Sequence, residues 1–158
     1  MTSEHKTHFA LEFFGQSVLL LNSHDDVNWQ EIGLIDMSDP DFTETMIDFH
    51  AEVSMKSTQN AEVMVFLPME DVVLDTVAVN NISNDFKAKS GYPITDASYV
   101  VGNANDAGQA NILYAQRETL TEAANFIAKY GFVATAFSAR INVTGFDQLP
   151  RLFLTQST

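Results

Sequence analysis

Residues 62–67 read EVMVFL, and Pro68 follows them directly. After Glu62 the run is continuously apolar, which is typical of a strand that is buried on both faces. A proline ends such a strand because it has no amide hydrogen to donate to a neighbour. We therefore predict a central strand at residues 62–67, and the other elements are placed outward from it.

Upstream of this strand, the sequence predicts three further strands. Residues 8–14 alternate and then become apolar, and residues 18–21 read VLLL, with Gly15-Gln16 between the two runs. This spacing is typical of a hairpin closed by a short turn. Residues 29–35 predict the third strand, with Gly33 inside it.

A helix is predicted between the third strand and the central strand. Ser38 offers a capping hydroxyl, with an early proline at position 40 and an acid at position 41. Apolar residues then recur at helical spacing, at positions 42, 46, 49 and 53. We expect this helix to end near Met55, before the polar stretch at residues 56–60.

Downstream, the pattern predicts a second set of strands. Residues 71–79, 98–101 and 112–115 are rich in strand-forming residues, and residues 82–91 predict a short helix. The polar run at residues 103–108 indicates a hairpin loop.

One more helix and one more strand complete the pattern. The sequence TLTE at residues 119–122 has the form of a capping box, so a helix is expected to begin there. Gly131 is expected to end this helix, with Phe132 packing back over its last turn. Residues 132–137 predict the last strand, and residues 142–158 predict an irregular tail apart from 152–154.

The resulting order is β-β-β-α-β, followed by β-α-β-β-α-β. The predicted fold class is therefore α/β with a mixed sheet. The first part has the element order of a ribonuclease H-like lobe, and the second that of a small accessory subdomain. At 158 residues we expect a single domain, 1–158. Its predicted parts are a core half at 8–68, an accessory half at 69–140 and a tail at 141–158.

The composition excludes several functions. The net charge is −13, from 21 acids and 8 scattered bases, so no basic face for nucleic acid or for anionic lipid is expected. The chain contains no cysteine, which removes thiolate chemistry and cysteine-dependent metal sites. No apolar run is long enough to span a bilayer, and the polar first residues lack the core of a signal peptide. A cytoplasmic location is expected.

Three short passages carry a resemblance to a known group of proteins. They are MVFLP at 64–68 with EDVVL at 70–74, YPITDASY at 92–99, and AQRETL at 115–120 followed by Gly131-Phe132. They resemble actin-like bacterial assembly proteins, namely the cytoplasmic domain of the type II secretion L subunit and the type IV pilus M protein. The span from Phe9 to about Leu154 is also similar to the N-terminal domain of uncharacterised bacterial proteins, some labelled translocase.

The resemblance implies an actin-like lobe without nucleotide hydrolysis. The active relatives hold phosphate with a loop that reads Asp-x-Gly-Thr-x-x-x-Lys, and here Glu12, Phe14 and Leu19 stand at the Asp, Gly and Lys positions. Phe14 would block the close backbone approach that phosphate requires. The implied role is a non-catalytic adaptor or scaffold, with no cofactor. Its expected partner is a protein, such as a membrane-anchored assembly protein, and a homodimer is also considered.

The candidate partner-binding residues are Arg117, Tyr92 and Tyr99. An isolated arginine in an acidic chain suits recognition of a partner carboxylate, although an internal salt bridge to Asp96 or Glu118 explains it as well. The expected contact surface is residues 70–117, where edge strands are predicted. A small-ligand pocket lined by Phe and Met between the two parts is a further alternative.

The sequence offers no catalytic or metal site that we favour. A degenerate phosphoesterase or nuclease of ribonuclease H-like fold would need Glu12 and Glu62 side by side. The stretch His24-Asp25-Asp26 and the acids between Asp36 and Glu44 are interpreted as a polar turn and as helix capping. His50 is expected at the surface or boundary of the first helix. The motifs of serine hydrolases and of nucleotide-binding loops are absent.

Overall fold

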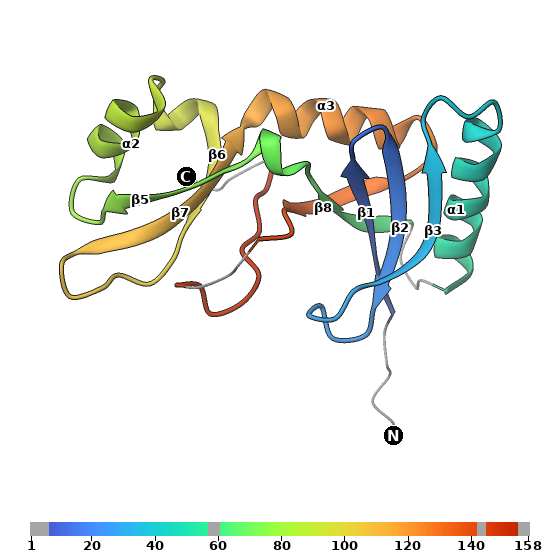
Figure 1. Ribbon diagram of the computed structural model, residues 1–158, viewed down its shortest axis with the longest axis horizontal. Coiled ribbons are helices and arrows are strands. Elements are labelled where there is room, and N and C mark those ends of the chain that lie inside the picture. Colours follow the sequence, from blue (N-terminus) through green and yellow to red (C-terminus); the bar gives the residue numbers. More distant parts are fainter. Residues whose placement is uncertain (1–6, 57–60, 142–144, 155–158) are drawn as a thin grey trace.

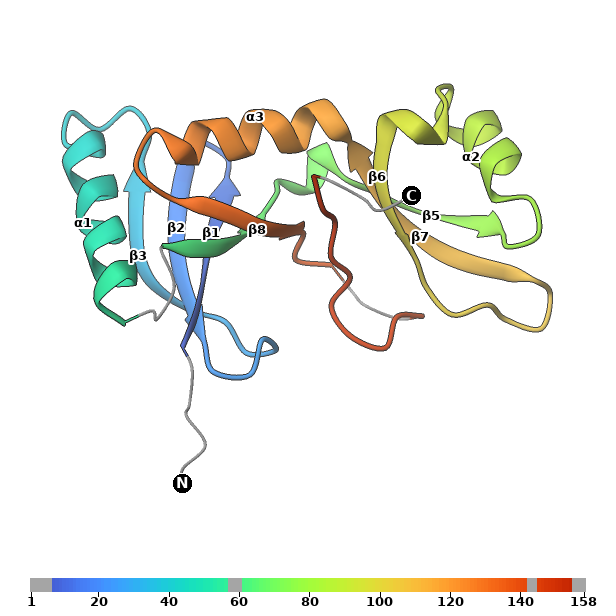
Figure 2. The same cartoon turned by 180° about the vertical axis from the view of Figure 1, so that it is seen from behind.

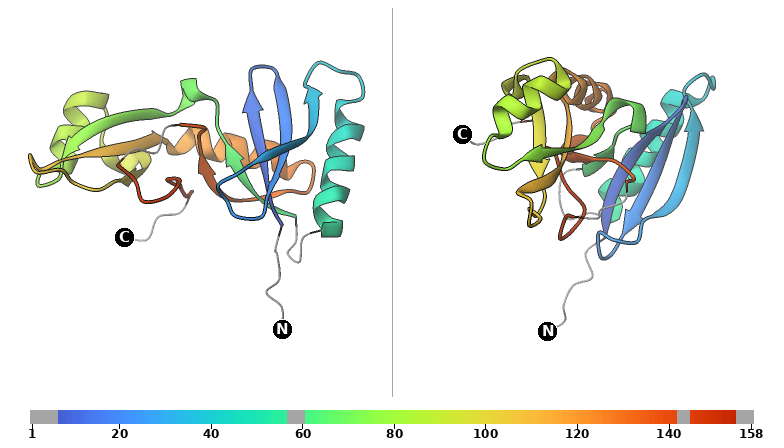
Figure 3. Two further views of the ribbon diagram at one scale, coloured as in Figure 1. Left: turned by 60° about the horizontal axis from the view of Figure 1, so that its bottom comes forward. Right: turned by 60° about the vertical axis from the view of Figure 1, so that its left-hand side comes forward.

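A computed structural model describes residues 7–56, 61–141 and 145–154 of the chain. Two β-sheets lie beside one another along the long axis of the molecule, with α1 at one end and α2 near the other (Figures 1 and 3). The predicted α/β class is confirmed.

In chain order the elements are β1 (His8–Phe14), β2 (Ser17–Ser23), β3 (Gln30–Asp36), α1 (Phe42–Lys56), β4 (Glu62–Phe66), the single turn η1 (Met69–Asp71), β5 (Val73–Ala78), α2 (Ile82–Ser90), the single turn η2 (Ile94–Asp96), β6 (Ala97–Val101), β7 (Gln109–Gln116), α3 (Arg117–Ala128) and β8 (Val133–Ser138).

The larger sheet has five strands in the order β3-β2-β1-β4-β8. β1, β2 and β3 are joined as antiparallel neighbours, whereas β4 runs parallel to both β1 and β8. Strands that run parallel cannot be joined by a tight turn and need a crossover connection. The crossover from β1–β3 to β4 is α1, and the crossover from β4 to β8 contains every element from η1 to α3. This is the strand order of a ribonuclease H-like lobe.

Helices α1 and α3 cover the same face of the five-stranded sheet. Both helices contribute side chains to one large core cluster, which also holds the sheet residues that face them. Alternation along each strand places one set of side chains in this core and the next set on the opposite face. The sheet and helix residues of the cluster include Leu11, Val18, Leu20, Ile35, Met46, Phe49, Val53, Val63, Val65, Leu120 and Ile127.

The smaller sheet has three strands in the order β5-β7-β6, and both pairs are antiparallel. The predicted loop at residues 103–108 joins β6 to β7. In it, Asn105 Oδ1 accepts hydrogen bonds from the amides of Ala107 and Gln109. Helix α2 packs on one face of this sheet through the buried Phe86, which lies against Tyr114 with a ring-centroid distance of 4.6 Å.

The predicted boundary at residue 68, between a core half and an accessory half, does not separate the two sheets. β8 comes from the part of the chain predicted as an accessory half, yet it pairs with β4 in the larger sheet. The accessory structure is therefore an insertion between β4 and α3, and α3 and β8 return the chain to the core. An element order alone does not say which strand pairs with which, so this insertion was not visible in the sequence.

The segment at residues 145–154 lies between the two sheets and contacts both (Figure 2). Leu152 and Phe137 exchange two backbone hydrogen bonds of 2.7 and 2.8 Å along the edge of β8. On the other side, the Ser98 hydroxyl donates to the Phe153 carbonyl and accepts from the Phe153 amide. Leu152 is fully buried in the main core. The segment therefore ties edge strand β8 to edge strand β6.

Two of the predicted helix starts are wrong. α3 begins at Arg117, directly after β7, so Thr119 is inside the helix and caps nothing. Ser38 does not reach α1, because its hydroxyl donates to Asp36 Oδ1 at 2.6 Å. The predicted end of α3 is confirmed: Gly131 has φ of 92°, and the amide of buried Phe132 donates to the Ile127 carbonyl.

Replacing Leu152 with alanine should lower the free energy of unfolding by about 2–5 kcal/mol, because a fully buried leucine leaves a cavity between the sheets. Phe153→Ala is the matched control. Its side chain is 44% exposed and its backbone bonds to Ser98 survive the change, so a loss of about 1 kcal/mol or less is expected. Urea unfolding followed by circular dichroism measures both, and equal losses would contradict this role of Leu152.

Candidate functional site

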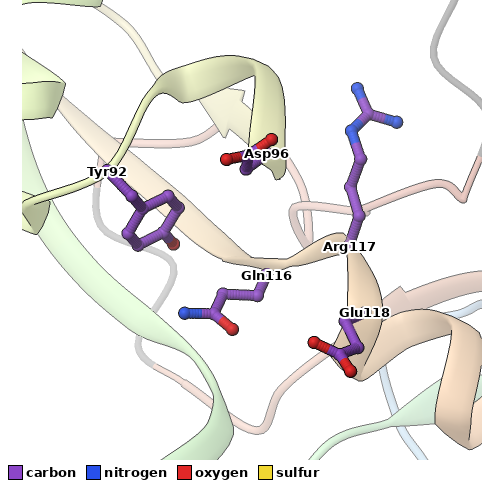
Figure 4. Close-up of a pocket in the computed structure, with 5 residues that line it drawn as sticks. All are labelled: Tyr92, Asp96, Gln116, Arg117 and Glu118. Atoms are coloured by element: carbon purple, nitrogen blue, oxygen red, sulfur yellow. The ribbon is translucent and has the colours of Figure 1, made fainter.

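A hollow of about 380 Å³ opens where the three-stranded sheet meets α3. It is lined by Tyr92, Asp96, Gln116, Arg117 and Glu118, and we call it the junction hollow (Figure 4). Two of the three predicted partner-binding residues, Tyr92 and Arg117, are thus placed at one site. The third, Tyr99, lies on β6 opposite Tyr114 of β7 and packs against the cluster around Phe86.

The backbone that forms the hollow has little freedom. β7 ends at Gln116, and α3 begins at the next residue without an intervening loop. Gln116 is still extended, with φ of −67° and ψ of 140°, so the chain turns from strand to helix within one residue. Gln116 and Glu118 are exposed, whereas Leu120 is fully buried and holds the helix on the core. The polar side chains of the hollow therefore stand on a fixed support.

The opposite wall is formed by the chain between α2 and β6. Gly91 ends α2 in the left-handed conformation, with φ of 87°, which a residue with a side chain adopts only under strain. The Asp96 amide donates to the Pro93 carbonyl at 3.0 Å, closing the single turn η2. Together the two turns bring Tyr92 and Asp96 to the same rim of the hollow.

Tyr92 is fixed by aromatic contacts. Its ring meets Phe86 edge-on at a centroid distance of 5.4 Å and lies 6.4 Å from Tyr114. Burial raises the pKa of the Tyr92 phenol, and the nearby Tyr114 and Asp96 raise it further. The phenol therefore remains a protonated hydrogen-bond donor and acceptor over the whole physiological pH range.

The Arg117 guanidinium binds backbone carbonyls. Nε donates to the carbonyl of Thr95 at 3.0 Å, and Nη1 donates to the carbonyl of Leu154 at 3.1 Å. Figure 4 shows this side chain directed away from Tyr92, Gln116 and Glu118. The structure thus gives Arg117 a structural task, which is to hold the segment at residues 145–154 against the turn before β6.

The groups that line the open part of the hollow are mainly acceptors. Asp96 and Glu118 contribute carboxylates, Gln116 contributes an amide, and Tyr92 contributes its phenol. Such a set suits a cationic group, for which charge-assisted hydrogen bonds to carboxylates are the strongest contacts. In the sequence, Asp96 and Glu118 were considered only as salt-bridge partners of Arg117, and Gln116 was not considered. The strand-to-helix junction at 116–118 was the signal that could have identified Gln116 and Glu118.

The pair of acids required for phosphoesterase or nuclease chemistry does not form. In the register of β1 and β4, Glu12 lies opposite Phe66, and Glu62 lies four residues earlier on β4. At the usual rise per residue this separates the two acids by about 13 Å along the strand. The alternative that depended on Glu12 and Glu62 is therefore wrong. Glu12 instead lies 3.4 Å from Arg140, and its burial raises its pKa.

The other polar clusters are turns or boundary residues. Asp25 accepts from the amides of Val27 and Asn28, so the stretch at His24 is a polar turn. Asp36 and Asp39 accept from nearby amides before α1 in the same way. His50 is partly buried and meets Phe132 at a centroid distance of 5.4 Å. In the described part of the chain, no three His, Asp or Glu residues converge as metal ligands would.

The fold is similar to that of bacterial assembly proteins. No protein-family model matches the chain, and no curated protein matches it by sequence. Among solved structures, it is similar to the cytoplasmic domain of EpsL, an inner membrane component of the type II secretion system of Vibrio cholerae. The TM-score is 0.59 at 12% identity, over 84% of this chain and 57% of that one. It is also similar to a chain of the PilM–PilN type IV pilus biogenesis complex, with a TM-score of 0.50 at 11% identity, over 84% and 47% of the two chains.

These similarities confirm the actin-like fold and the predicted likeness to the secretion and pilus proteins. At such identities they show the fold alone. The chain spans about half the length of the structures it matches. Among the helices of the described residues, none combines the length and apolar character needed to cross a bilayer.

The raised phenol pKa values lead to a titration experiment. Burial raises the pKa of both Tyr92 and Tyr114 above the ordinary value near 10, so the fold favours their neutral forms. This contribution to stability is fully present below about pH 10 and is lost as the pH rises through the raised values. When the folded protein is titrated, part of the tyrosinate absorbance should therefore appear only at a pH above that at which an ordinary tyrosine ionises. Tyr92→Phe and Tyr114→Phe should each reduce this high-pH part. A titration curve without it would contradict the packing described for Tyr92.

Proposed function

We propose that this chain is a non-catalytic adaptor that binds a protein partner within a larger assembly, of the kind that secretion and pilus systems form. The observation that carries the proposal is the junction hollow, in which two carboxylates, an amide and a phenol gather between the strand-to-helix junction and the turns before β6. Arg117 also lines the hollow, but its guanidinium donates to the backbone carbonyls of Thr95 and Leu154. A lysine or arginine side chain, or the amino terminus of a partner segment, is the group that fits this set.

The position of the hollow supports binding of a protein segment rather than of a free small molecule. The hollow lies at the surface, with Gln116 and Glu118 exposed, and it falls largely within residues 70–117, the predicted contact surface. Each of its lining residues carries a polar or charged group, whereas a small-ligand pocket is usually lined by hydrophobic side chains with a few placed polar groups. The pocket lined by Phe and Met that was considered from the sequence is not the hollow that the structure presents.

The region that corresponds to a phosphate loop supports the absence of nucleotide hydrolysis. Gly15 and Gln16 close a tight hairpin, with Phe14 paired to Ser17. The Phe14 side chain is 70% exposed at this turn. Phenylalanine stands where the phosphate loop has a glycine, the residue that allows backbone and phosphate to approach closely.

The names of the similar structures support a role in an assembly. EpsL is described as an inner membrane component of a secretion system, and PilM as part of a complex with PilN. By analogy, the proposed partner of this chain is a membrane-anchored assembly protein that presents a basic segment on the cytoplasmic side. The acidic balance of the chain, 21 acids against 8 bases, favours association with such a segment.

An array of random-sequence peptides tests the proposal. The wild-type chain should retain peptides that contain lysine or arginine. The double variant Asp96→Asn/Glu118→Gln should retain these peptides about tenfold more weakly, because removing the charged partner of a hydrogen bond typically costs about 1.5–3 kcal/mol. Fluorescently labelled protein on the array measures the retention.

A matched control separates the site from the overall charge. Asp106→Asn/Glu122→Gln removes two exposed acids outside the hollow and changes the net charge equally. This variant should select peptides as the wild type does. Equal effects of the two double variants, or a wild-type chain with no preference for basic peptides, would rule out the hollow as the binding site.

A further inference from the structure

The second face of the five-stranded sheet is covered only in part. Its central residues form a separate small core of Ala10, Leu21, Met64 and Phe66. Trp29, from the β2–β3 connection, lies over Phe66 with a ring-centroid distance of 5.4 Å, and Leu149 packs beside it. The helices α1 and α3 belong to the cluster on the opposite face.

The outer part of this face, over β1, β2 and β3, is open. Phe14 is 70% exposed and Leu34 is 56% exposed. The strand register places Leu34 beside Leu19, which is only partly buried, and Leu19 beside Glu12. We call Phe14, Leu19 and Leu34 the open strip. Contiguous exposed apolar side chains of this kind are typical of contact surfaces.

The edge of the sheet does not favour the addition of another strand. β3 is the outermost strand, as Figure 3 shows. The register of β2 and β3 shifts between Leu20 and Leu21, so that Ile32 has no direct partner and β3 is bulged. A bulge disturbs the regular spacing that a new strand would need. A helix that lies across the face requires no such register.

The charges around the open strip are negative. Burial raises the pKa of Glu12, the nearby Arg140 lowers it, and the carboxylate of Glu31 is close enough to raise it as well. Asp36 lies in the next row, opposite Ser17, and hydrogen bonds from Ser38 lower its pKa, so it is ionised at neutral pH. The cation beside them, Arg140, is paired with Glu12 and lies over the Phe66 ring at 5.2 Å. A second copy of the chain would bring the same acids to this surface, and like charges oppose each other.

We propose that the open strip docks an amphipathic helix of a partner protein, with leucine-like side chains on Phe14, Leu19 and Leu34 and with lysine or arginine beside Glu12, Glu31 and Asp36. Apolar residues at helical spacing match a strip that crosses three adjacent strands. This surface lies on the five-stranded sheet and shares no residue with the junction hollow. The chain then has two separate contact sites.

Three synthetic peptides of about 18 residues, long enough to form a helix on binding, serve as probes. The first has leucine on one face and lysine on the other, the second replaces lysine with glutamate, and the third replaces leucine with serine. Titration into isotope-labelled protein, followed by amide cross-peaks, should show the leucine–lysine peptide shifting residues of β1, β2 and β3. The other two peptides should bind at least about tenfold more weakly.

A pair of matched variants locates the site. Phe14→Gln/Leu34→Gln should weaken binding of the leucine–lysine peptide by about tenfold. Val73→Gln/Leu74→Gln changes two other exposed apolar side chains, 41% and 43% exposed, on edge strand β5 of the smaller sheet, and should leave binding unchanged. Both variants alter exposed side chains, so both should fold.

Several outcomes would overturn the proposal. Equal binding of the serine–lysine peptide would mean that charge alone attracts the probe. Equal weakening by both variant pairs, or shifts outside β1–β3, would place the contact elsewhere. Concentration-dependent dimerisation that Phe14→Gln/Leu34→Gln abolishes would assign the strip to a second copy of the chain.

Discussion

Strand β4 is apolar on both faces, and the cores on both sides of the five-stranded sheet are built around it. Val63 and Val65 lie under α1 and α3, while Met64 and Phe66 lie on the opposite face beneath Trp29 and Leu149. Exposing those four side chains to water would cost roughly 6–12 kcal/mol, a large part of the stability of a small domain. Because β4 runs parallel to both of its neighbours, the chain must also leave the sheet and return by crossover connections.

The second crossover explains where the candidate site lies. Between β4 and β8 the chain forms the three-stranded sheet, and β7 then passes without a loop into α3, which carries it back to the core. The junction hollow is the place where this return begins. The segment at residues 145–154 connects the two sheets a second time, since Leu152 pairs with β8 while Phe153 contacts β6. Both candidate contact surfaces thus follow from the burial of β4. The junction hollow lies on the crossover that connects β4 to β8, and the open strip lies on the face of the five-stranded sheet opposite α1 and α3.

Local patterns in the sequence predicted most elements, because apolar periodicity and turn residues act over a few positions. The central strand, both hairpins and the end of α3 at Gly131 were found in this way. The membership of β8 in the larger sheet was not, since pairing between residues 62–66 and 133–138 is set by tertiary packing. The start of α3 was missed because Thr119 resembles a cap, whereas β7 continues into the helix. Tyr92 and Arg117 were named from the sequence as candidate partner-binding residues, and both line the hollow. Asp96 comes from the turn before β6, about 20 residues away in the chain, so its closeness to Glu118 became visible only in three dimensions.

The most direct test of the adaptor account is site-specific photo-crosslinking in cells that express the chain. A photoreactive amino acid at position 116, in the junction hollow, should form a discrete adduct with one protein, and Asp96→Asn/Glu118→Gln should abolish it. The same amino acid at position 55, where Met55 is 83% exposed at the end of α1, should give no such adduct. Adducts of equal yield from both positions, or a position 116 that captures no protein in any condition, would contradict the account.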